Sequence, residues 1–449
     1  MEQKLEKKYG LLTAICMVVG IVMGSGVFFK AEAVLTATNG NMPLGILAWM
    51  IVGCIMLVCS YMFSIIAKKY KDANGLVDYA TATMGKRFAF YIGWFMATIY
   101  TPSLNGVVTW VSARYLCVVL GFDIAGGECM TIAAFILIAI YAMNAIAPKL
   151  AGHFQVSTTM IKMIPLAGMA FVGIFYGIGS GTLSQNLDTI QVATSSNGLM
   201  SAIVATAFAY EGWILATSIQ CELKNPEKDL SKALVIGSII VAVTYLLYYI
   251  GLHGAVTTTQ LMENGETGAR LAFETLFGSA AGTGVFILIV VSCLGTLNGL
   301  MLSNCRAFYA LSPTMKSPAK ELLGSIDPQT NMPANSSILG LCMAGFWFLY
   351  FYGANLTSGW FGIFNFDSSE LPIITLYGFY VFIFIAFMIK SSELSKVHRF
   401  IIPVLSIACC LFMIFAAILS HGIITVGCYM ILFAIIMLAG SLCYQKDEA

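Results

Sequence analysis

Charged residues are scarce in this chain of 449 residues, because Asp, Glu, Lys and Arg together make up only 10% of it. Soluble globular proteins carry roughly 25%. A surface that faces water cannot be built from so few charges, so the composition excludes a soluble enzyme and a nucleic-acid-binding protein. The 23 basic and 22 acidic residues nearly cancel and leave a net charge of +1. The net charge therefore gives no sign of an acidic or a basic partner.

Metal-binding and catalytic motifs are also missing. The 13 cysteines include no C-x-x-C or C-x-x-H spacing, and the sequence has no His-rich tract. This speaks against a metal site or a redox dithiol. Neither H-E-x-x-H nor G-x-S-x-G occurs, so the sequence offers no nucleophile or metal cluster for an intramembrane enzyme. We expect no catalytic residues, no metal and no cofactor.

Long apolar runs are what the sequence has in abundance. Apolar residues make up 59% of the chain, and its mean hydropathy is +0.86. Runs of about 18 to 25 residues recur, each long enough as a helix to cross the ~30 Å hydrocarbon core. We therefore predict an all-α polytopic membrane protein with one transmembrane domain over residues 1–449. Its twelve predicted spans are about 11–36, 44–67, 88–119, 130–147, 154–177, 197–220, 232–253, 283–310, 336–352, 361–389, 398–419 and 421–443.

The placement of the basic residues predicts the orientation of the chain. With twelve spans, both termini lie on one side of the membrane. Lys30 and Arg270 fall on the far side and Arg114 and Lys162 lie within spans, so the other 19 of the 23 basic residues are on the side of the termini. Basic residues are enriched in cytoplasmic loops. The sequence therefore predicts a multi-pass plasma membrane protein with both termini in the cytoplasm.

Two predicted spans contain residues that weaken a helix. The first has Gly20, Gly24 and Gly26 around Ser25, and the sixth has Glu211 followed by a glycine. Glycine costs a helix about 1 kcal/mol relative to alanine, and a carboxylate at mid-membrane costs more. We expect both helices to unwind there, as helices do around the binding sites of transporters. The expected organisation is two inverted repeats, about 11–177 and 197–389, each starting with a broken helix, and two extra helices at 398–443.

An unwound helix offers two opposed sets of backbone groups. N–H groups and the positive end of a helix dipole suit a carboxylate, whereas free carbonyls suit an ammonium group. The N–H groups after the first break are those of Ser25, Gly26 and Val27. The carbonyls before it, and those near the second break, are those of Ile21, Val22, Met23, Phe208 and Ala209. The combination predicts a site for the zwitterion of an α-amino acid; the alternative for G-S-G is close packing of two helices.

Four motifs resemble those of one transporter family. They are GIVMGSGVFF in the first span, FQVSTTMIKMIPLAG in the fifth, FAYEGW in the sixth and CELKNPEKDL directly after it. Together they resemble the amino acid/polyamine/organocation superfamily, and within it the L-amino acid transporter branch with its bacterial serine/threonine-exchanger-like members. The resemblance covers nearly the whole chain. It implies a twelve-helix, five-plus-five inverted repeat with helices 1 and 6 broken, and sodium-independent amino acid transport.

Lys162 is the candidate for a structural cation. It lies about eight residues into the predicted fifth span, roughly 12 Å from the cytoplasmic end, and Pro165 frees a carbonyl nearby. The resemblance implies that its ammonium replaces a sodium ion in bracing the broken first helix; a proton-carrying role stays open. The resemblance also implies a lid role for Phe208 and a substrate contact for Asn105. Residues that we expect to join Lys162 are Tyr245, Ser292 and Thr296.

Because of three carboxylates, the sequence does not decide the charge class of the substrate. Glu211 stands where animal members of the family carry glycine, and its carboxylate favours short polar or even cationic substrates. Asp367 and Glu370, at the start of the tenth span, either add negative charge to the outer half or belong to a solvated vestibule mouth or a helix N-cap.

The sequence as a whole predicts a secondary transporter that exchanges small neutral L-amino acids by alternating access. Two alternatives stay open: a proton-coupled amino acid importer, and a carrier of cationic amino acids or amines. A channel is disfavoured because two broken helices suit an occluded site better than a continuous pore. Besides the amino acid and the lipid bilayer we expect no obligatory protein partner and no nucleic acid. Animal members of the family pair with a glycoprotein through a disulfide, and only Cys129 is placed near an external loop here.

Overall fold

The computed structural model describes residues 10–24, 26–70, 75–188 and 198–445. Within these ranges, twelve helical stretches are long and apolar enough to cross a membrane. The described residues form no strand beyond one isolated bridge between Met315 and Tyr444. This confirms the predicted all-α architecture.

The helices follow one another closely along the chain. The first ten are α1 (Leu11–Val22), α2 (Gly26–Ala37), α3 (Met42–Lys69), α4 (Leu76–Met84), α5 (Lys86–Phe95), α6 (Thr101–Leu120), α7 (Gly127–Ile146), α8 (Pro148–Gly168), α9 (Ile174–Ser180) and α10 (Thr182–Asp188). The next ten are α11 (Gly198–Ala209), α12 (Pro226–Ala255), α13 (Thr258–Asn264), α14 (Gly268–Phe277), α15 (Ser279–Leu311), α16 (Ala319–Leu323), α17 (Ala334–Phe351), α18 (Leu371–Lys390), α19 (Ile402–His421) and α20 (Ile423–Cys443).

Short stretches of tighter or wider helix join or extend these elements. The π-helical ones are η1 (Met96–Tyr100), η2 (Met169–Gly173), η6 (Tyr352–Leu356) and η8 (Val397–Ile401). The 3₁₀ ones are η3 (Trp213–Glu222), η4 (Gly265–Thr267), η5 (Ser312–Thr314) and η7 (Gly362–Phe364). π-Helical turns are rare and are frequent at functional sites, which draws attention to η1 and η2 inside two long spans.

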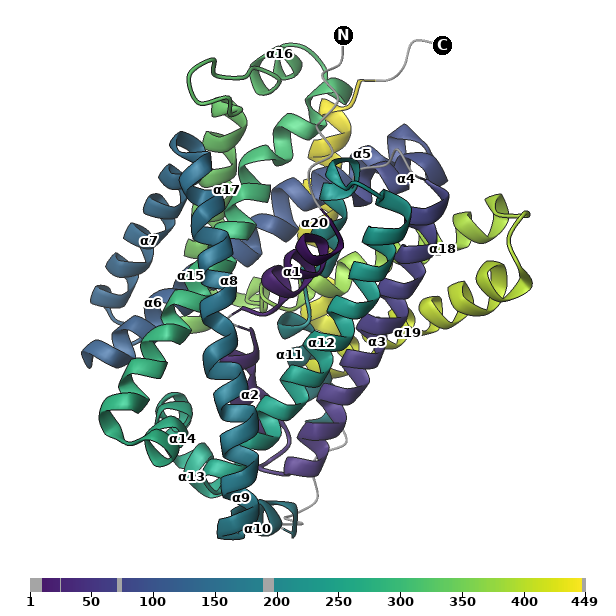
Figure 1. Ribbon diagram of the computed structural model, residues 1–449. Coiled ribbons are helices and arrows are strands. Elements are labelled where there is room, and N and C mark those ends of the chain that lie inside the picture. The colour runs from purple at the N-terminus through teal and green to yellow at the C-terminus, as the bar shows by residue number, and fades with distance from the viewer. Residues whose placement is uncertain (1–9, 25, 71–74, 189–197, 446–449) are drawn as a thin grey trace.

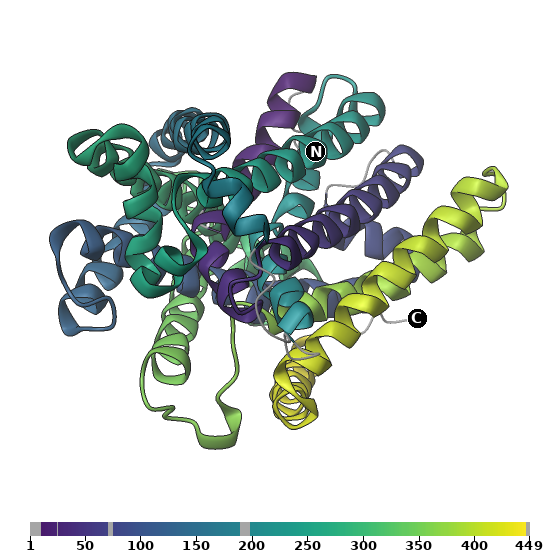
Figure 2. The ribbon, with the colours of Figure 1, turned by 90° about the horizontal axis from the view of Figure 1, so that it is seen from below.

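The long helices run side by side and define two ends of the molecule. In Figure 1, α16 and the end of α20 lie at the top, whereas α10, α13 and α14 lie at the bottom. Backbone bonds from Lys316 and Gln445 join the start of the α16 segment to the end of α20. Figure 2 shows α19 and α20 at the edge of the bundle. Only 17% of the α20 span is buried within the protein, as expected for a helix that faces lipid.

Small residues allow several helices to touch along their backbones. A Cβ atom on Gly173 of η2 would lie 2.3 Å from the carbonyl oxygen of Gly251 in α12. A Cβ atom on Gly106 of α6 would lie 2.7 Å from the backbone nitrogen of Phe348 in α17. Such close approach replaces the hydrophobic effect as a source of helix association in lipid.

The predicted bounds of the fifth span are wrong at its start. Helix α8 begins at Pro148 rather than near residue 154, because proline suits the first turn of a helix and only Ala147 separates α7 from α8. Lys162 therefore lies 14 residues into its helix, about 21 Å along the axis rather than 12 Å.

Candidate binding site

The first interruption separates α1 from α2. Met23 ends α1: its N–H donates to the Val19 carbonyl at 2.8 Å, but its ψ of 90° leaves the helical region. Gly24 follows and packs directly on α15, where an added Cβ would lie 2.0 Å from Thr296 Oγ1. No other residue fits at this position without movement of α15. Ser25, a predicted contact, lies outside the described residues.

The second interruption follows α11. Helix α11 ends at Ala209, and the chain turns through Gly212, whose φ of +99° is a conformation that side-chain-bearing residues rarely adopt. The Glu211 N–H reaches the Phe208 carbonyl only at 3.4 Å. The chain then continues as the 3₁₀ helix η3, so the backbone is irregular at both places where glycine weakens the sequence pattern.

The two interruptions pack against each other. A Cβ atom on Gly26, the first residue of α2, would lie 2.5 Å from the Ala209 Cα atom. A Cβ atom on Gly212 would lie 2.9 Å from Ile21 Cγ2. These contacts bring the end of α1 to the second break and the start of α2 to the end of α11. Residues about 190 positions apart thus build one site, as the prediction of a shared site requires.

A cavity with an empty volume of about 350 Å³ lies where the two interruptions meet. Its walls come from both breaks and from the helices α6 and α15. The lining residues are Ile21, Val22, Gly24, Gly26, Leu104, Val108, Phe208, Glu211, Gly212, Thr296 and Leu300. Helix α2 points its N-terminal end at the cavity, and the first N–H groups of a helix have no carbonyl partner within it.

Two side chains hold the last turn of α1. Lys162 Nζ in α8 donates to the Gly20 carbonyl at 2.7 Å, and the Tyr245 hydroxyl in α12 donates to the Val22 carbonyl at 2.8 Å. Both side chains are fully buried. Carbonyls at the end of a helix lack intrahelical donors, so these two bonds satisfy acceptors that the interruption creates. The structure brings Lys162 and Tyr245 to the broken helix, as the sequence predicts.

The other two predicted neighbours of Lys162 behave differently. Thr296 faces Gly24 and lines the cavity, and its hydroxyl donates to the Ser292 carbonyl at 3.3 Å. The Ser292 hydroxyl is buried and has no hydrogen-bond partner within the described part of the chain. Thr296 is therefore placed at the cavity, whereas Ser292 is not hydrogen-bonded to the α1 carbonyls.

Glu211 is the one acidic residue in the cavity wall. It is 7% exposed, and its Oε1 accepts a hydrogen bond from the Tyr100 hydroxyl at 2.6 Å. Tyr100 is the last residue of the π-helical turn η1, just before Pro102. The sequence pattern does not predict the contact of Tyr100 with Glu211. The one local indication of an irregular helix there is Pro102, because proline disturbs the regular helix around it. Within the described ranges, no group of three His, Cys, Asp or Glu residues is arranged to hold a metal ion.

Asn105 does not line the cavity, although its neighbours Leu104 and Val108 do. Its amide nitrogen donates to the Thr101 carbonyl of its own helix at 2.9 Å. Its Oδ1 atom is buried and has no hydrogen-bond partner among the described residues. The substrate contact of Asn105 therefore stays a prediction.

Phe208 separates the cavity from a group of charges. Its ring lines the cavity, and Lys30 Nζ of α2 lies 5.4 Å from the ring centroid. Lys30 in turn contacts Glu370, which is only 7% exposed. The interpretation of Glu370 as part of a solvated mouth is thus wrong, because Lys30 and the surrounding helices cover it. Asp367 is more exposed and accepts the Ser369 N–H at 2.6 Å in the turn before α18.

Comparisons with known proteins find similarity to amino acid transporters. The family model described as amino acid permease matches residues 9–440. The serine/threonine exchanger SteT of Bacillus subtilis is 29% identical over 402 residues, which cover 89% of this chain and 87% of that protein. The b(0,+)-type amino acid transporter 1 of Mus musculus is 25% identical over 68% of this chain and 62% of its own length. The human cystine/glutamate transporter is 24% identical over 75% of this chain and 66% of its own length.

Proposed function

The chain belongs to the amino acid permease family, and from this premise we propose that it exchanges small neutral L-amino acids across the plasma membrane without sodium. The chain is thus an integral membrane transporter of amino acids and not an enzyme. The substrate class, the exchange mode and the orientation are the parts that we propose. The observation that carries the proposal is the meeting of the two helix interruptions at one small cavity.

The backbone at the cavity supports a zwitterionic substrate. The first N–H groups of α2, including those of Gly26 and Val27, and the positive end of its dipole suit the carboxylate. The carbonyls of Ile21 and Phe208 belong to cavity-lining residues and suit the ammonium. Met23 and Ala209 flank these groups, and Gly24 keeps the space beside them free of a side chain. Both poles of an α-amino acid therefore have complementary partners.

The rest of the wall supports a short side chain. Leu104, Val108 and Leu300 provide apolar surface, and Thr296 and Glu211 provide hydrogen-bonding groups. A small side chain with a hydroxyl group matches this combination. The name of the similar Bacillus subtilis protein, a serine/threonine exchanger, agrees with it.

Lys162 supports sodium independence. Its ammonium lies at the end of α1, bonded to the Gly20 carbonyl, where a cation satisfies acceptors that face into the break. A covalently attached cation removes the need for a bound one. In this proposal Lys162 holds α1 in place and Tyr245 assists it.

The orientation and partners complete the proposal. The positive-inside rule supports cytoplasmic termini, which assigns the α10, α13 and α14 end of Figure 1 to the outside. Cys129 is fully buried in the first turn of α7. A buried thiol is poorly placed for a disulfide with another subunit, which supports a transporter that works without an obligatory partner.

Exchange assays in proteoliposomes test the proposal. The purified protein is reconstituted into liposomes that are loaded with an unlabelled amino acid or left empty, and the uptake of labelled amino acids is measured. We expect uptake only into loaded liposomes, equal rates in sodium and choline buffers, no effect of an imposed pH gradient, and preference for small neutral substrates.

Two other results would replace the proposal with its alternatives. Uptake into empty liposomes that follows an imposed pH gradient would show a proton-coupled importer. Preferential uptake of lysine, arginine or an amine would show a carrier of cations, with Glu211 as the attracting group.

A further inference from the structure

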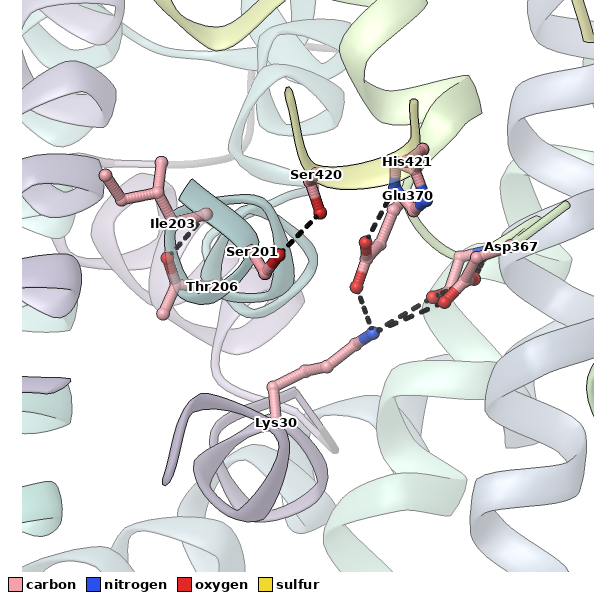
Figure 3. Close-up of polar contacts among 9 residues, drawn as sticks. Lys30, Ser201, Ile203, Thr206, Asp367, Glu370, Ser420 and His421 are labelled. Atoms are coloured by element: carbon pink, nitrogen blue, oxygen red, sulfur yellow. Dashed lines mark hydrogen bonds and ion pairs between the residues drawn. The ribbon is translucent and has the colours of Figure 1, made fainter. Parts of the chain in front are cut away.

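A group of charged side chains joins α2 to the start of α18 on the side of Phe208 away from the cavity. Figure 3 shows Lys30 reaching from α2 toward Glu370 and Asp367. Lys30 Nζ lies 2.7 Å from Glu370 Oε1 and 3.9 Å from Asp367 Oδ2, and it donates to Ser369 Oγ at 3.1 Å. These residues are about 340 positions apart in the chain. The pair therefore ties two separate helices together.

Helix α19 takes part through its last residue. His421 Nε2 lies 3.0 Å from the second carboxylate oxygen of Glu370. One residue earlier, Ser420 donates to Ser201 of α11 at 3.1 Å, as Figure 3 also shows. Glu370 thus lies between α2 and α19, and α19 also contacts the helix that carries Phe208.

The Lys30–Glu370 pair is almost completely shielded from solvent. Lys30 is 3% exposed and Glu370 is 7% exposed. Other charged groups near Lys30 are Asp367 and, on α6, Arg114, which itself pairs with Glu32 of α2 at 3.2 Å. The group thus holds the two cations Lys30 and Arg114 and the three carboxylates of Glu32, Asp367 and Glu370. Removal of one partner of such a pair leaves a buried charge without compensation, which strongly disfavours the closed arrangement.

The position of the pair relative to the cavity gives it a function. Lys30 lies on the same helix as Gly26, which lines the cavity, and its ammonium is above the ring of Phe208. If a substrate enters from this side, it passes Phe208, and a contact that holds α2 against the start of α18 would block that route.

We propose that the Lys30–Glu370 ion pair is the contact that closes the outer side of the transporter, and that α2 separates from α18 only when this pair breaks. The inference rests on the proposed function for the assignment of the outer side. When the helices separate, water hydrates both charges, and this hydration offsets much of the electrostatic attraction that is lost. A charged pair that is buried only in the closed state therefore suits a contact that forms and breaks in every cycle.

Accessibility of the cavity from outside tests the inference. Leu104 is 4% exposed and lines the cavity, so Leu104→Cys supplies a thiol there. Its reaction with a membrane-impermeant thiol reagent is followed in intact cells, against the same protein without the added cysteine. We expect Lys30→Met and Glu370→Gln to raise the labelling rate roughly tenfold or more, since each loses a charge-assisted bond.

Two further variants separate gating from misfolding. Lys30→Arg keeps the positive charge, and we expect labelling near the rate of the parent protein. Arg270→Met removes a charge on the same side, but Arg270 pairs with Glu274 within its own helix, so labelling should not change. Each variant has to be monodisperse after purification.

The outcomes are distinct from those of the exchange assay. Unchanged labelling in both well-folded Lys30→Met and Glu370→Gln would overturn the inference even if the parent protein exchanges amino acids. Absence of exchange by the parent protein would overturn the proposed function, whatever the labelling rates are.

Discussion

Glu211 and Tyr100 together shape the part of the cavity that faces a substrate side chain. The Tyr100 hydroxyl occupies one carboxylate oxygen of Glu211 at 2.6 Å, which fixes the orientation of the group. The carboxylate also borders the cavity. We expect a substrate with a short hydroxyl-bearing side chain to donate to it, which a bulky apolar side chain cannot do.

Glu211→Gly tests this role through specificity. Loss of the carboxylate removes both volume and a polar group from the cavity wall, so we expect leucine-sized apolar amino acids to become effective competitors of exchange. Tyr100→Phe leaves the carboxylate in place but releases it, and we expect roughly tenfold weaker binding of serine with little gain for leucine. Competition profiles of the two variants, measured in proteoliposomes, check this. An unchanged profile in Glu211→Gly would return the residue to a purely structural role.

Single residues differ in how far the sequence predicts their place. Gly24, Gly26 and Glu211 are identifiable because each conflicts locally with a helix in a membrane. Tyr100 is not, because its contact with Glu211 joins residues 111 positions apart. The same holds for the Lys30–Glu370 pair, 340 positions apart. Such contacts depend on how helices pack, about which the hydropathy pattern says nothing.

At the scale of helices, α1 is held from two sides. Lys162 binds it from α8 and Tyr245 from α12, each through a carbonyl of its last turn. A regular helix has no free carbonyl to offer at that depth. The interruption therefore does two things: it forms one end of the cavity and supplies the acceptors through which neighbouring helices hold α1.

Lys162→Ala is the variant that releases α1 from α8. Loss of a charge-assisted bond of about 1.5–3 kcal/mol changes the ratio of two conformational states by roughly ten- to a hundredfold. We expect slower exchange at saturating substrate, and no recovery in sodium buffer if the site accepts only the tethered ammonium. Lys149→Ala, an exposed position in the first turn of the same helix, is the matched control and should exchange normally. A normal rate in Lys162→Ala would show that the bond to Gly20 is dispensable.

Helix boundaries show where local sequence signals are sufficient. Helix α14 (Gly268–Phe277) is one such case, because the glycines Gly268 and Gly278 mark both of its ends. In contrast, the predicted start of the fifth span, near residue 154, lies six residues after the start of α8 at Pro148. Polar residues such as Lys149 and His153 resemble a loop in a hydropathy pattern, but Pro148 starts a helix that continues through them.

For the whole molecule, the count of twelve spans and the all-α fold follow from hydropathy and length, since lipid leaves few alternatives. The predicted inverted repeat places a broken helix at the start of each half, and the meeting of Gly26 with Ala209 and of Gly212 with Ile21 brings those two helices to one site. In this account an outer contact between α2 and α18 and an inner contact between α1 and α8 lie on opposite sides of the cavity. Their alternation would expose the cavity to one side at a time.

The most direct test of the central claim, that this cavity binds the amino acid, is equilibrium binding of a labelled substrate to purified protein. Gly26→Val fills the space beside the N–H groups of α2, because a Cβ atom there lies 2.5 Å from the Ala209 Cα atom. Gly427→Val, in the outer helix α20 where a Cβ atom meets nothing within 4 Å, is the control. We expect binding of labelled serine to be lost in Gly26→Val and kept in Gly427→Val. Normal binding by a well-folded Gly26→Val protein would contradict it.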